Sequence, residues 1–397
     1  MNPFRAQLPV YSPLTLGALG AGLLAALGAG QARRRVEQAL RAQYAPHGLL
    51  LTDSGTSALA LALRLAVAER PGPVALPAYC CYDVATAVDA AGVPFLLYDL
   101  DPATLGPDEA SLRAALAAGA GTVVVVHLYG VPVDVPAVRA LASERGTIIV
   151  DDAAQGAGAS IGGRPAGMLG RFGVLSFGRG KGVTGGSGGT LLAAEPTAAA
   201  AVAGIGERLA PPAGEVRAAL ALTAQWALAR PALYGLPLSI PALGLGETIY
   251  RPPHPPRRCG AFPLGVLSRM LPLAEAEAAR RRANAGRLRA ALAGARGVSA
   301  IQPSDGSEPG WLRLPVRLAV GDARESVAVA RAKRLGVWPG YPRSLADLAG
   351  FGGRRCNAGT EFPGALELAS RLVTLPTHGR LAPHDVAALE AWIVKRG

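Results

Sequence analysis

The sequence contains little lysine, few aromatic residues and few cysteines. Only three of its 397 residues are lysines, and aromatic side chains make up 5%. The four cysteines show no CxxC spacing: they are Cys80, Cys81, Cys259 and Cys356. We interpret them as reduced thiols and expect a cytoplasmic protein without a metal site.

Charged residues are also scarce, at 17%, and they are unbalanced. Forty Lys and Arg face 28 Asp and Glu, so the net charge is +12 and arginine carries nearly all of it. This surplus favours anionic partners. The chain lacks a recognition helix, zinc spacing and an aromatic-rich basic stretch, which argues against nucleic acid. Phosphorylated small molecules or an acidic surface are the expected partners.

The N-terminus lacks a secretory pattern, because Met1–Pro13 has one arginine and three prolines and no clear cleavage site follows. Leu14–Gly30 is an uncharged run rich in glycine and alanine, which makes it weakly apolar for a membrane span. We expect a packed arm or a helix at a subunit interface. Membrane contact is the alternative.

The next part of the chain alternates short apolar runs with helical patterns, which predicts an α/β fold with a mostly parallel sheet flanked by helices. Ligands bind such sheets at the carboxyl ends of the strands. The expected strands are Leu49–Thr52, Val74–Leu76, Phe95–Tyr98, Thr122–Leu128, Thr147–Val150 and Gly173–Phe177, and the expected helices include Gln31–Tyr44, Ala58–Ala68, Ser111–Ala118 and Val135–Arg145.

Beyond this region the pattern predicts a smaller α+β domain. A helix is expected over Glu207–Arg230, and the proline- and glycine-rich stretch Pro231–Pro256 is the candidate boundary. Ala274–Leu292 and Pro383–Val394 are predicted helices. We therefore divide the chain into an apolar arm at 1–30, a large domain at 31–240 and a small domain at 241–397.

Residues that could take part in catalysis follow two of the expected strands. The run Thr147–Val150 ends in Asp151 and Asp152, and the run Gly173–Phe177 leads to Lys181 in a glycine-rich loop. A lysine for covalent attachment and a carboxylate for a pyridine nitrogen are the parts of a pyridoxal phosphate (PLP) site. Further upstream, the sequence DSGTS lies between a strand and a helix, a geometry that binds phosphate and also suits an ordinary helix cap.

Several segments resemble, in order, the motifs of the DegT/StrS family of PLP-dependent nucleotide-sugar aminotransferases, which have the aspartate aminotransferase fold type I. The resemblance implies a seven-stranded type of sheet in the large domain. The resemblance runs from about Leu49 to the C-terminus. It is carried by DSGTSALALAL, LPAY, VVVVHLYGVPVDVPAV, IIVDDAAQGAGA, LSFGRGKGVTGGSGGTLLA and FPGALELASRLVTLPTH.

The resemblance implies a role for each matching residue. Lys181 matches the lysine that bonds to the cofactor and moves the proton in transamination, and Asp152 matches the aspartate that keeps the pyridine nitrogen protonated. Gln155 matches the glutamine beside the cofactor ring. The residues that match the phosphate-binding turn and its neighbouring serine are Gly55, Thr56, Ser57 and Ser176.

Two departures from the family pattern affect the rim of the site. The family's stacking aromatic is replaced by Cys81, with Tyr82 or Tyr79 as possible substitutes. The segment whose asparagine and arginine reach the neighbouring subunit lacks the asparagine, which leaves Arg257 or Arg258 to supply the charge. Further positions of interest are His127, expected to support the site by a hydrogen bond, and Tyr341 and Arg343, expected to border the substrate cleft.

The resemblance implies a homodimeric, PLP-dependent aminotransferase that moves an amino group, from glutamate, to a nucleotide-linked keto-sugar. One alternative is a PLP enzyme that acts on a lipid-linked sugar or a non-nucleotide ketone, which the apolar segments at Leu14–Gly30 and Ala218–Leu245 would suit. The other is a DegT-like protein that binds a ligand for regulation without turnover. Retention of Lys181, Asp152 and Gln155 argues against that second alternative.

Overall fold

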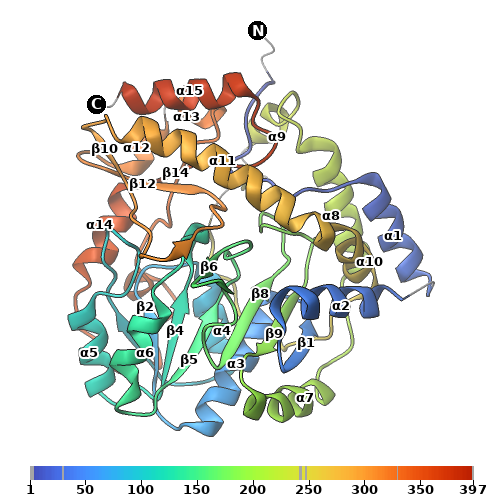
Figure 1. Ribbon diagram of the computed structural model, residues 1–397, viewed down its shortest axis with the longest axis vertical. Helices are drawn as coiled ribbons and strands as arrows, with labels where there is room; N and C mark the ends of the chain where they lie inside the picture. Colours follow the sequence, from blue (N-terminus) through green and yellow to red (C-terminus); the bar gives the residue numbers. More distant parts are fainter. Residues whose placement is uncertain (1–3, 29–30, 241–243, 246–247, 329, 396–397) are drawn as a thin grey trace.

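A seven-stranded sheet lies at the centre of the protein (Figure 1). The computed structural model describes residues 4–28, 31–240, 244–245, 248–328 and 330–395. The strand order is β1-β9-β8-β5-β4-β2-β3, and β9 alone runs antiparallel to both of its neighbours. The predicted fold class is confirmed. The strands are β1 Gly48–Thr52, β2 Val74–Pro77, β3 Phe95–Tyr98, β4 Thr122–Val126, β5 Ile148–Asp152, β8 Phe172–Ser176 and β9 Gly189–Ala193.

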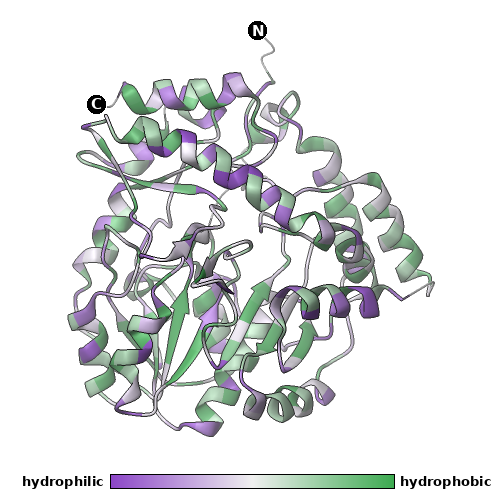
Figure 2. Cartoon of the chain, in the orientation of Figure 1, coloured by the Kyte–Doolittle hydropathy of each residue, from purple (hydrophilic) through white to green (hydrophobic). Residues whose placement is uncertain are grey.

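Both faces of this sheet are buried under helices. In the valine-rich strand β4, Val124 packs on the side of α3, whereas Val123 and Val125 pack with Leu112 of α5 and Val138 of α6. Successive strand residues point to opposite faces, so a strand covered on both sides is apolar throughout, as the green central strands in Figure 2 show. The helices of this part are α2 Ala32–Tyr44, α3 Gly55–Glu69, α4 Tyr82–Ala91, α5 Glu109–Ala117, α6 Val135–Ser143 and α7 Ala199–Glu207.

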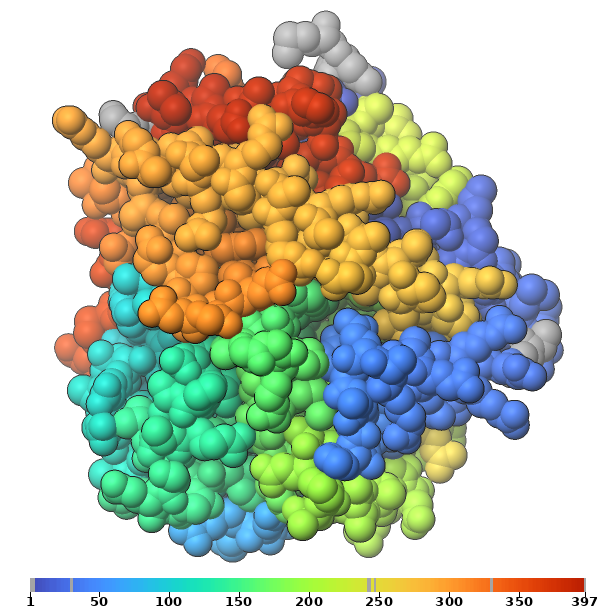
Figure 3. All heavy atoms as spheres, in the orientation of Figure 1, coloured from blue at the N-terminus to red at the C-terminus, as the bar shows by residue number. Residues whose placement is uncertain are grey.

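A second, antiparallel sheet belongs to the C-terminal part, whose orange and red residues gather on one side of the molecule in Figure 3. Its order is β10-β12-β14-β13, and helices α11 and α15 pack beside it. The strands are β10 Val298–Ala300, β12 Leu314–Leu318, β13 Trp338–Pro339 and β14 Leu372–Leu375, and the helices are α11 Ala274–Leu292, α12 Ala323–Ala328, α13 Ala330–Arg334, α14 Pro363–Arg371 and α15 Pro383–Val394.

A small three-stranded sheet joins the two parts. Its central strand, β6 (Ser160–Ile161), pairs with β7 (Arg164–Pro165) and with β11 (Ser307–Glu308). Two backbone hydrogen bonds lie nearby: Gly310 N donates to Gly130 O at 2.9 Å, and Arg313 N donates to Tyr129 O at 3.3 Å. The entry to β12 is therefore fixed directly to the loop that follows β4.

The apolar N-terminal run forms helix α1, Leu16–Ala26, which packs closely against α10, Ala261–Met270. The approach depends on glycine, because a Cβ on Gly22 would lie 2.8 Å from the Phe262 ring and one on Gly265 would lie 2.3 Å from Ala21 O. Four leucines of this region remain exposed: Leu16, Leu23, Leu24 and Leu27. Within the described residues, no helix is long and apolar enough to cross a membrane.

The prediction of one continuous helix over Glu207–Arg230 is wrong for about its first third. Helix α7 ends at Glu207, and α8 covers Glu215–Leu228, followed by the short α9 at Gly235–Leu238. Pro211 and Pro212 lie in the gap, where proline cannot donate the helical hydrogen bond and restrains the residue before it.

The predicted domain division stays a prediction. Its boundary falls at 240–241, and residues 241–243 lie outside the described residues. Helix α10, which that division assigns to the C-terminal unit, packs against α1 and α2 of the N-terminal part.

Candidate active site

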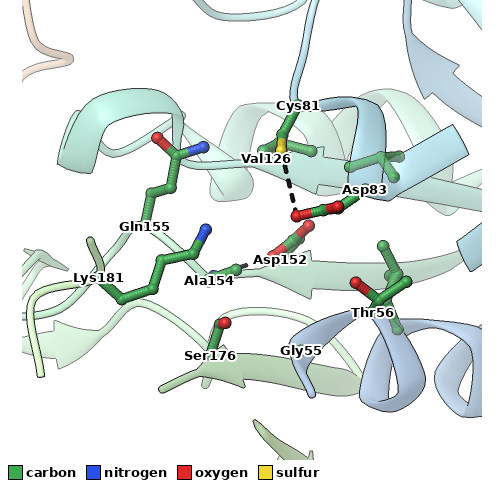
Figure 4. Close-up of a pocket in the computed structure, with 12 residues that line it drawn as sticks. Gly55, Thr56, Cys81, Asp83, Val126, Asp152, Ala154, Gln155, Ser176 and Lys181 are labelled. Carbon is green, nitrogen blue, oxygen red and sulfur yellow. Dashed lines mark hydrogen bonds between the residues drawn. The ribbon is translucent and has the colours of Figure 1, made fainter. Parts of the chain in front are cut away.

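Seven of the ten sequence-predicted site residues line one pocket at the carboxyl ends of β1, β5 and β8. About 400 Å³ of space, including the open mouth, lies between these strand ends and the starts of α3 and α4. Figure 4 shows Lys181 and Gln155 on one side of Asp152 and Thr56 on the other. The lining residues are Gly55, Thr56, Leu59, Cys81, Asp83, Val84, Val126, Asp152, Ala154, Gln155, Ser176 and Lys181.

Asp152 is the buried acid of this pocket. Its Oδ1 accepts a hydrogen bond from Ala154 N at 2.9 Å. Burial raises the pKa of Asp152 to about 6, and the neighbouring Lys181 opposes this shift. A buried carboxylate with a raised pKa gains from a cationic partner, so this position suits a protonated ring nitrogen.

Asp151 points away from the pocket into a closed hydrogen-bond network. Its Oδ1 lies 2.6 Å from His127 Nε2, and its Oδ2 accepts hydrogen bonds from Gly167 N and Leu169 N at 2.7 and 2.8 Å. His127 Nδ1 accepts from Val133 N at 3.0 Å, so the ring proton lies on Nε2 and is donated to Asp151. This pair anchors the end of β5 and thereby positions Asp152.

The start of α3 forms the end of the pocket opposite Lys181. Ser54 caps the helix, because its hydroxyl accepts from Ser57 N and also lies within hydrogen-bond distance of the Ser57 hydroxyl, both at 3.1 Å. Thr56 is partly exposed and lines the pocket. A Cβ on Gly55 would lie 2.6 Å from Ser176 Cβ, so only glycine lets the helix start approach Ser176 this closely. The helix dipole makes this end suitable for an anion.

The loop that carries Lys181 is covered by the N-terminal segment. The Ser12 hydroxyl donates to the Lys181 backbone carbonyl, and Val10 packs beside Gly180. Gly180 has a φ of +77°, a conformation that favours glycine. The segment that the sequence suggested as an arm therefore holds the lysine loop in place.

Gln155 links the pocket to a group of tyrosines. Its Oε1 accepts from Tyr129 N at 3.1 Å, and its Nε2 donates to the Tyr341 hydroxyl at 2.8 Å. The rings of Tyr129 and Tyr341 stack, with centroids 5.7 Å apart. Tyr341 N in turn donates to the Tyr79 hydroxyl at 2.8 Å. The expected place of Tyr341 at the rim of the cleft stays a prediction, and its hydroxyl orients Gln155.

Cys81 lines the pocket where the family pattern has an aromatic residue. Its thiol lies 3.5 Å from Oδ2 of Asp83, and burial together with the Asp83 charge raises the pKa of Cys81 to about 12. The thiol is therefore neutral, so it offers contact rather than reactivity. Asp83 itself was missed from the sequence, because nothing in the pattern of α4 distinguished it from a surface residue in the first helical turn.

Three predicted cofactor-binding residues are not among the residues that line the pocket. Ser57 is buried, and both its N–H and its hydroxyl bond to Ser54. Its expected contact with the phosphate stays a prediction. Tyr82 is buried within the first turn of α4. Arg258 is exposed and pairs through its backbone with Thr52, next to the end of β1. The roles expected of Tyr82 and Arg258 stay predictions. No cluster of three metal-ligating side chains occurs among the residues that the structure describes.

A family model matches the N-terminal part of the chain. Residues 24–206 match the model of the DegT/DnrJ/EryC1/StrS aminotransferase family. A UDP-N-acetyl-3-dehydro-alpha-D-glucosamine 3-aminotransferase of Acidithiobacillus ferrooxidans is 38% identical over 125 residues, which are 31% of this chain and 34% of that protein. An L-glutamine:2-deoxy-scyllo-inosose aminotransferase of Streptomyces kanamyceticus is 32% identical over 147 residues, 37% of this chain and 34% of that protein. The aligned part thus spans about a third of each relative's length.

Solved structures match over the whole chain. The sugar aminotransferase CalS13 of Micromonospora echinospora superposes with a TM-score of 0.73 at 22% identity, and 100% of both chains is covered. At this identity the likeness establishes the fold. It extends the comparison beyond residue 206 to the C-terminal part of the chain.

Proposed function

We propose that this chain is a PLP-dependent aminotransferase of the DegT/DnrJ/EryC1/StrS family, whose model matches residues 24–206. The observation that carries the proposal is the convergence of Lys181, Asp152, Gln155, Ser176 and Thr56 on one pocket. These residues come from the ends of two strands, β5 and β8, and from the start of helix α3, which is far from both in the sequence. A chance arrangement would not place a lysine, a buried acid and an anion-binding helix end around one space.

The residues present fit the cofactor. The start of α3, with Thr56 and Ser176, offers hydroxyl groups and a helix dipole for its phosphate. Asp152 offers a buried carboxylate for its ring nitrogen, and Gln155 is held at the pocket wall by Tyr129 and Tyr341. When bound, PLP supplies an aldehyde that exchanges amino groups and a ring that withdraws electrons from the reacting carbon.

The protein's own contribution is binding, orientation and proton transfer. Lys181 Nζ would hold the cofactor and would move the proton of the donor's α-carbon. Asp152 keeps the ring nitrogen protonated, because the buried carboxylate is stabilised when it faces a cation. The His127–Asp151 pair fixes the end of β5, and the Ser12 contact fixes the Lys181 loop. The Asp152 carboxylate and the Lys181 amine therefore keep a constant separation.

For the substrates, we propose an amino acid donor, glutamate or glutamine, and a keto-sugar acceptor attached to a nucleotide. One of the similar proteins carries a UDP-linked sugar in its name, and another carries L-glutamine and a cyclic ketone. The net charge of +12 suits a diphosphate-bearing acceptor.

A screen with the purified protein tests this proposal. The PLP-loaded protein is mixed with one amino donor at a time, and conversion of the cofactor to its amino form is followed by absorbance. Nucleotide-linked keto-sugars are then added to the aminated form to restore the original spectrum. Conversion by an amino acid and restoration by a keto-sugar are expected. Failure of the protein to take up PLP, or the absence of conversion with every donor, would overturn the proposal.

We further propose that the protein acts as a homodimer. Exposed leucines on α1 and exposed apolar side chains on the adjacent α8, Val216 and Leu220, support a partner on this side. Light scattering after size-exclusion chromatography is expected to give twice the chain mass of 40.3 kDa. A monomer at micromolar concentration would contradict this proposal.

A further inference from the structure

Residues 5–12 belong to no helix or strand, yet most of them are buried. A segment without regular structure usually lies on the surface, because its backbone groups need hydrogen-bond partners. Here other elements supply the partners: Ala6 N donates to Pro231 O at 2.9 Å, and Gln7 N donates to Arg334 O at 2.8 Å. The segment is therefore built into the molecule and joins parts of the chain that are far apart in the sequence.

The loop between β14 and α15 binds the middle of this segment. His378 Nε2 lies 2.9 Å from the Leu8 carbonyl oxygen, and because a carbonyl only accepts, Nε2 carries the proton and donates it. His378 is fully buried, and its ring meets the Tyr11 ring edge-on, with centroids 5.9 Å apart. The Arg380 guanidinium lies 4.3 Å from the centroid of the Tyr11 ring and donates to its hydroxyl at 2.9 Å. Two side chains of the C-terminal part thus set the path of residues 8–11.

The end of the segment contacts the loop of the candidate catalytic lysine. The hydroxyl of Ser12, which is fully buried, donates to the Lys181 backbone carbonyl. Val10 lies 3.2 Å from the position that a Cβ on Gly180 would take. Within the loop, Lys181 N makes only a long hydrogen bond, to Gly178 O at 3.4 Å. The N-terminal segment therefore supports the backbone of Lys181 from outside its loop.

We propose that His378 and Arg380 are positioning residues for Lys181, and that residues 8–12 transmit their effect. Neither residue is among those that line the pocket. By holding Leu8 and Tyr11 they fix the place of the Ser12 hydroxyl. An amine reacts more slowly with a bound aldehyde when its backbone is free to move, because the reacting atoms lose their alignment. The proposal rests on the proposed role of Lys181 and gives the C-terminal part a route by which it acts on that residue.

Two substitutions interrupt this path at its two ends. Ser12→Ala removes the hydroxyl that bonds to the Lys181 carbonyl, and His378→Leu removes the donor to the Leu8 carbonyl. His378→Gln restores an N–H group for that bond. Arg380→Gln is a second remote change, so the test does not depend on the folding of His378→Leu.

Thr15→Ala is the matched control, because the Thr15 hydroxyl lies three residues after Ser12 and accepts from Ala18 N at 3.1 Å to cap α1. Thermal melting establishes that each variant is folded. Two forms of the cofactor are then compared. PLP bonds to the Lys181 amine with loss of water, and stopped-flow absorbance gives the rate constant of this capture. The amino form of the cofactor has no aldehyde and binds by its ring and phosphate alone, and calorimetry gives its Kd.

The rate constant of PLP capture is expected to fall about tenfold or more in Ser12→Ala, in His378→Leu and in Arg380→Gln. His378→Gln should capture PLP within about threefold of the wild-type rate, because the donor is restored. The Kd of the amino form, and every reading for Thr15→Ala, should change by less than about twofold, because distant sites act independently. The double variant Ser12→Ala/His378→Leu should be as slow as Ser12→Ala alone, since both changes act on one path.

Three results would overturn the inference and leave the proposed function intact. The first is unchanged PLP capture in Ser12→Ala. The second is a double variant that is slower than Ser12→Ala by the full factor seen for His378→Leu, which would mean that His378 acts independently of Ser12. The third is an equal loss of affinity for the amino form, which would mean that the whole pocket is disturbed. A wild-type protein that takes up no PLP would overturn the proposed function and the inference together.

Discussion

Asp151 and Asp152 are neighbours in β5, yet their carboxylates serve opposite faces of the sheet. Asp151 is closed into a network with His127, Gly167 and Leu169, whereas Asp152 lines the pocket with Lys181. The alternation of side chains along a strand produces this separation. Removing the charge should therefore have opposite consequences for the stability of the cofactor-free protein at the two positions.

Asp152→Asn should stabilise the cofactor-free protein at high pH. Burial raises the pKa of Asp152 to about 6, while the unfolded chain has the ordinary value of 3.8. Ionisation therefore favours the unfolded state, and the stability present below pH 4 is lost as the pH rises through about 6. The free energy of unfolding should rise by about 1–3 kcal/mol at pH 8 and hardly at all at pH 4.

Denaturant titration of the cofactor-free proteins at pH 4 and pH 8 measures this difference. The control is Asp305→Asn, at an exposed aspartate far along the chain, which should change stability by less than about 0.5 kcal/mol at either pH. If Asp152→Asn raised the free energy of unfolding equally at both pH values, ionisation of the Asp152 carboxylate would not be the cause of the increase. The same variant should lose transamination, because the amide cannot keep the ring nitrogen protonated.

Asp151→Asn should instead destabilise the protein. Its carboxylate accepts three hydrogen bonds in a fully buried setting, and an amide would bring N–H groups against at least one of those donors. A loss of about 2 kcal/mol or more in the free energy of unfolding is expected at pH 8. Thermal melting of Asp151→Asn is compared with that of the control variant Asp305→Asn. Stability equal to that of the wild type would contradict an anchoring role for the His127–Asp151 pair.

Gly55→Ala should separate the start of α3 from Ser176. The added Cβ would lie 2.6 Å from Ser176 Cβ, so the helix start must move. We expect a loss of stability of about 1–3 kcal/mol and weaker PLP binding, measured by denaturation and by cofactor titration. Gly20→Ala on α1 is the control, because nothing lies within 4 Å of the position its Cβ would take. Adding Ser176→Gly should recover stability, and a double variant as unstable as Gly55→Ala would refute the steric explanation.

Much of the fold and of the site could be predicted from the sequence. The valine-rich run Thr122–Leu128 indicated a strand buried on both faces, and the strand found there, β4, covers Thr122–Val126. Because parallel strands end at one edge, residues after such strands had to meet, and Lys181, Asp152 and Ser176 do meet there. The resemblance to a family supplied the chemical roles, which no spacing alone would give.

Other features depend on side-chain competition in three dimensions. Ser57 is used by the Ser54 cap, and a local pattern cannot say whether a hydroxyl turns inward or toward a ligand. Asp83 enters the pocket because α4 begins at its rim.

The central claim is that Lys181 is the residue that binds PLP, and the scarcity of lysine makes it directly testable. The other two lysines, Lys333 in α13 and Lys395 after α15, provide internal controls. The PLP-loaded protein is reduced with borohydride, digested and mapped by peptide mass spectrometry, with Lys181→Ala treated in parallel. We predict a phosphopyridoxyl label on Lys181 in the wild type and no label on the variant. A label on Lys333 or Lys395 at comparable yield, or an unlabelled wild type, would contradict the proposed function.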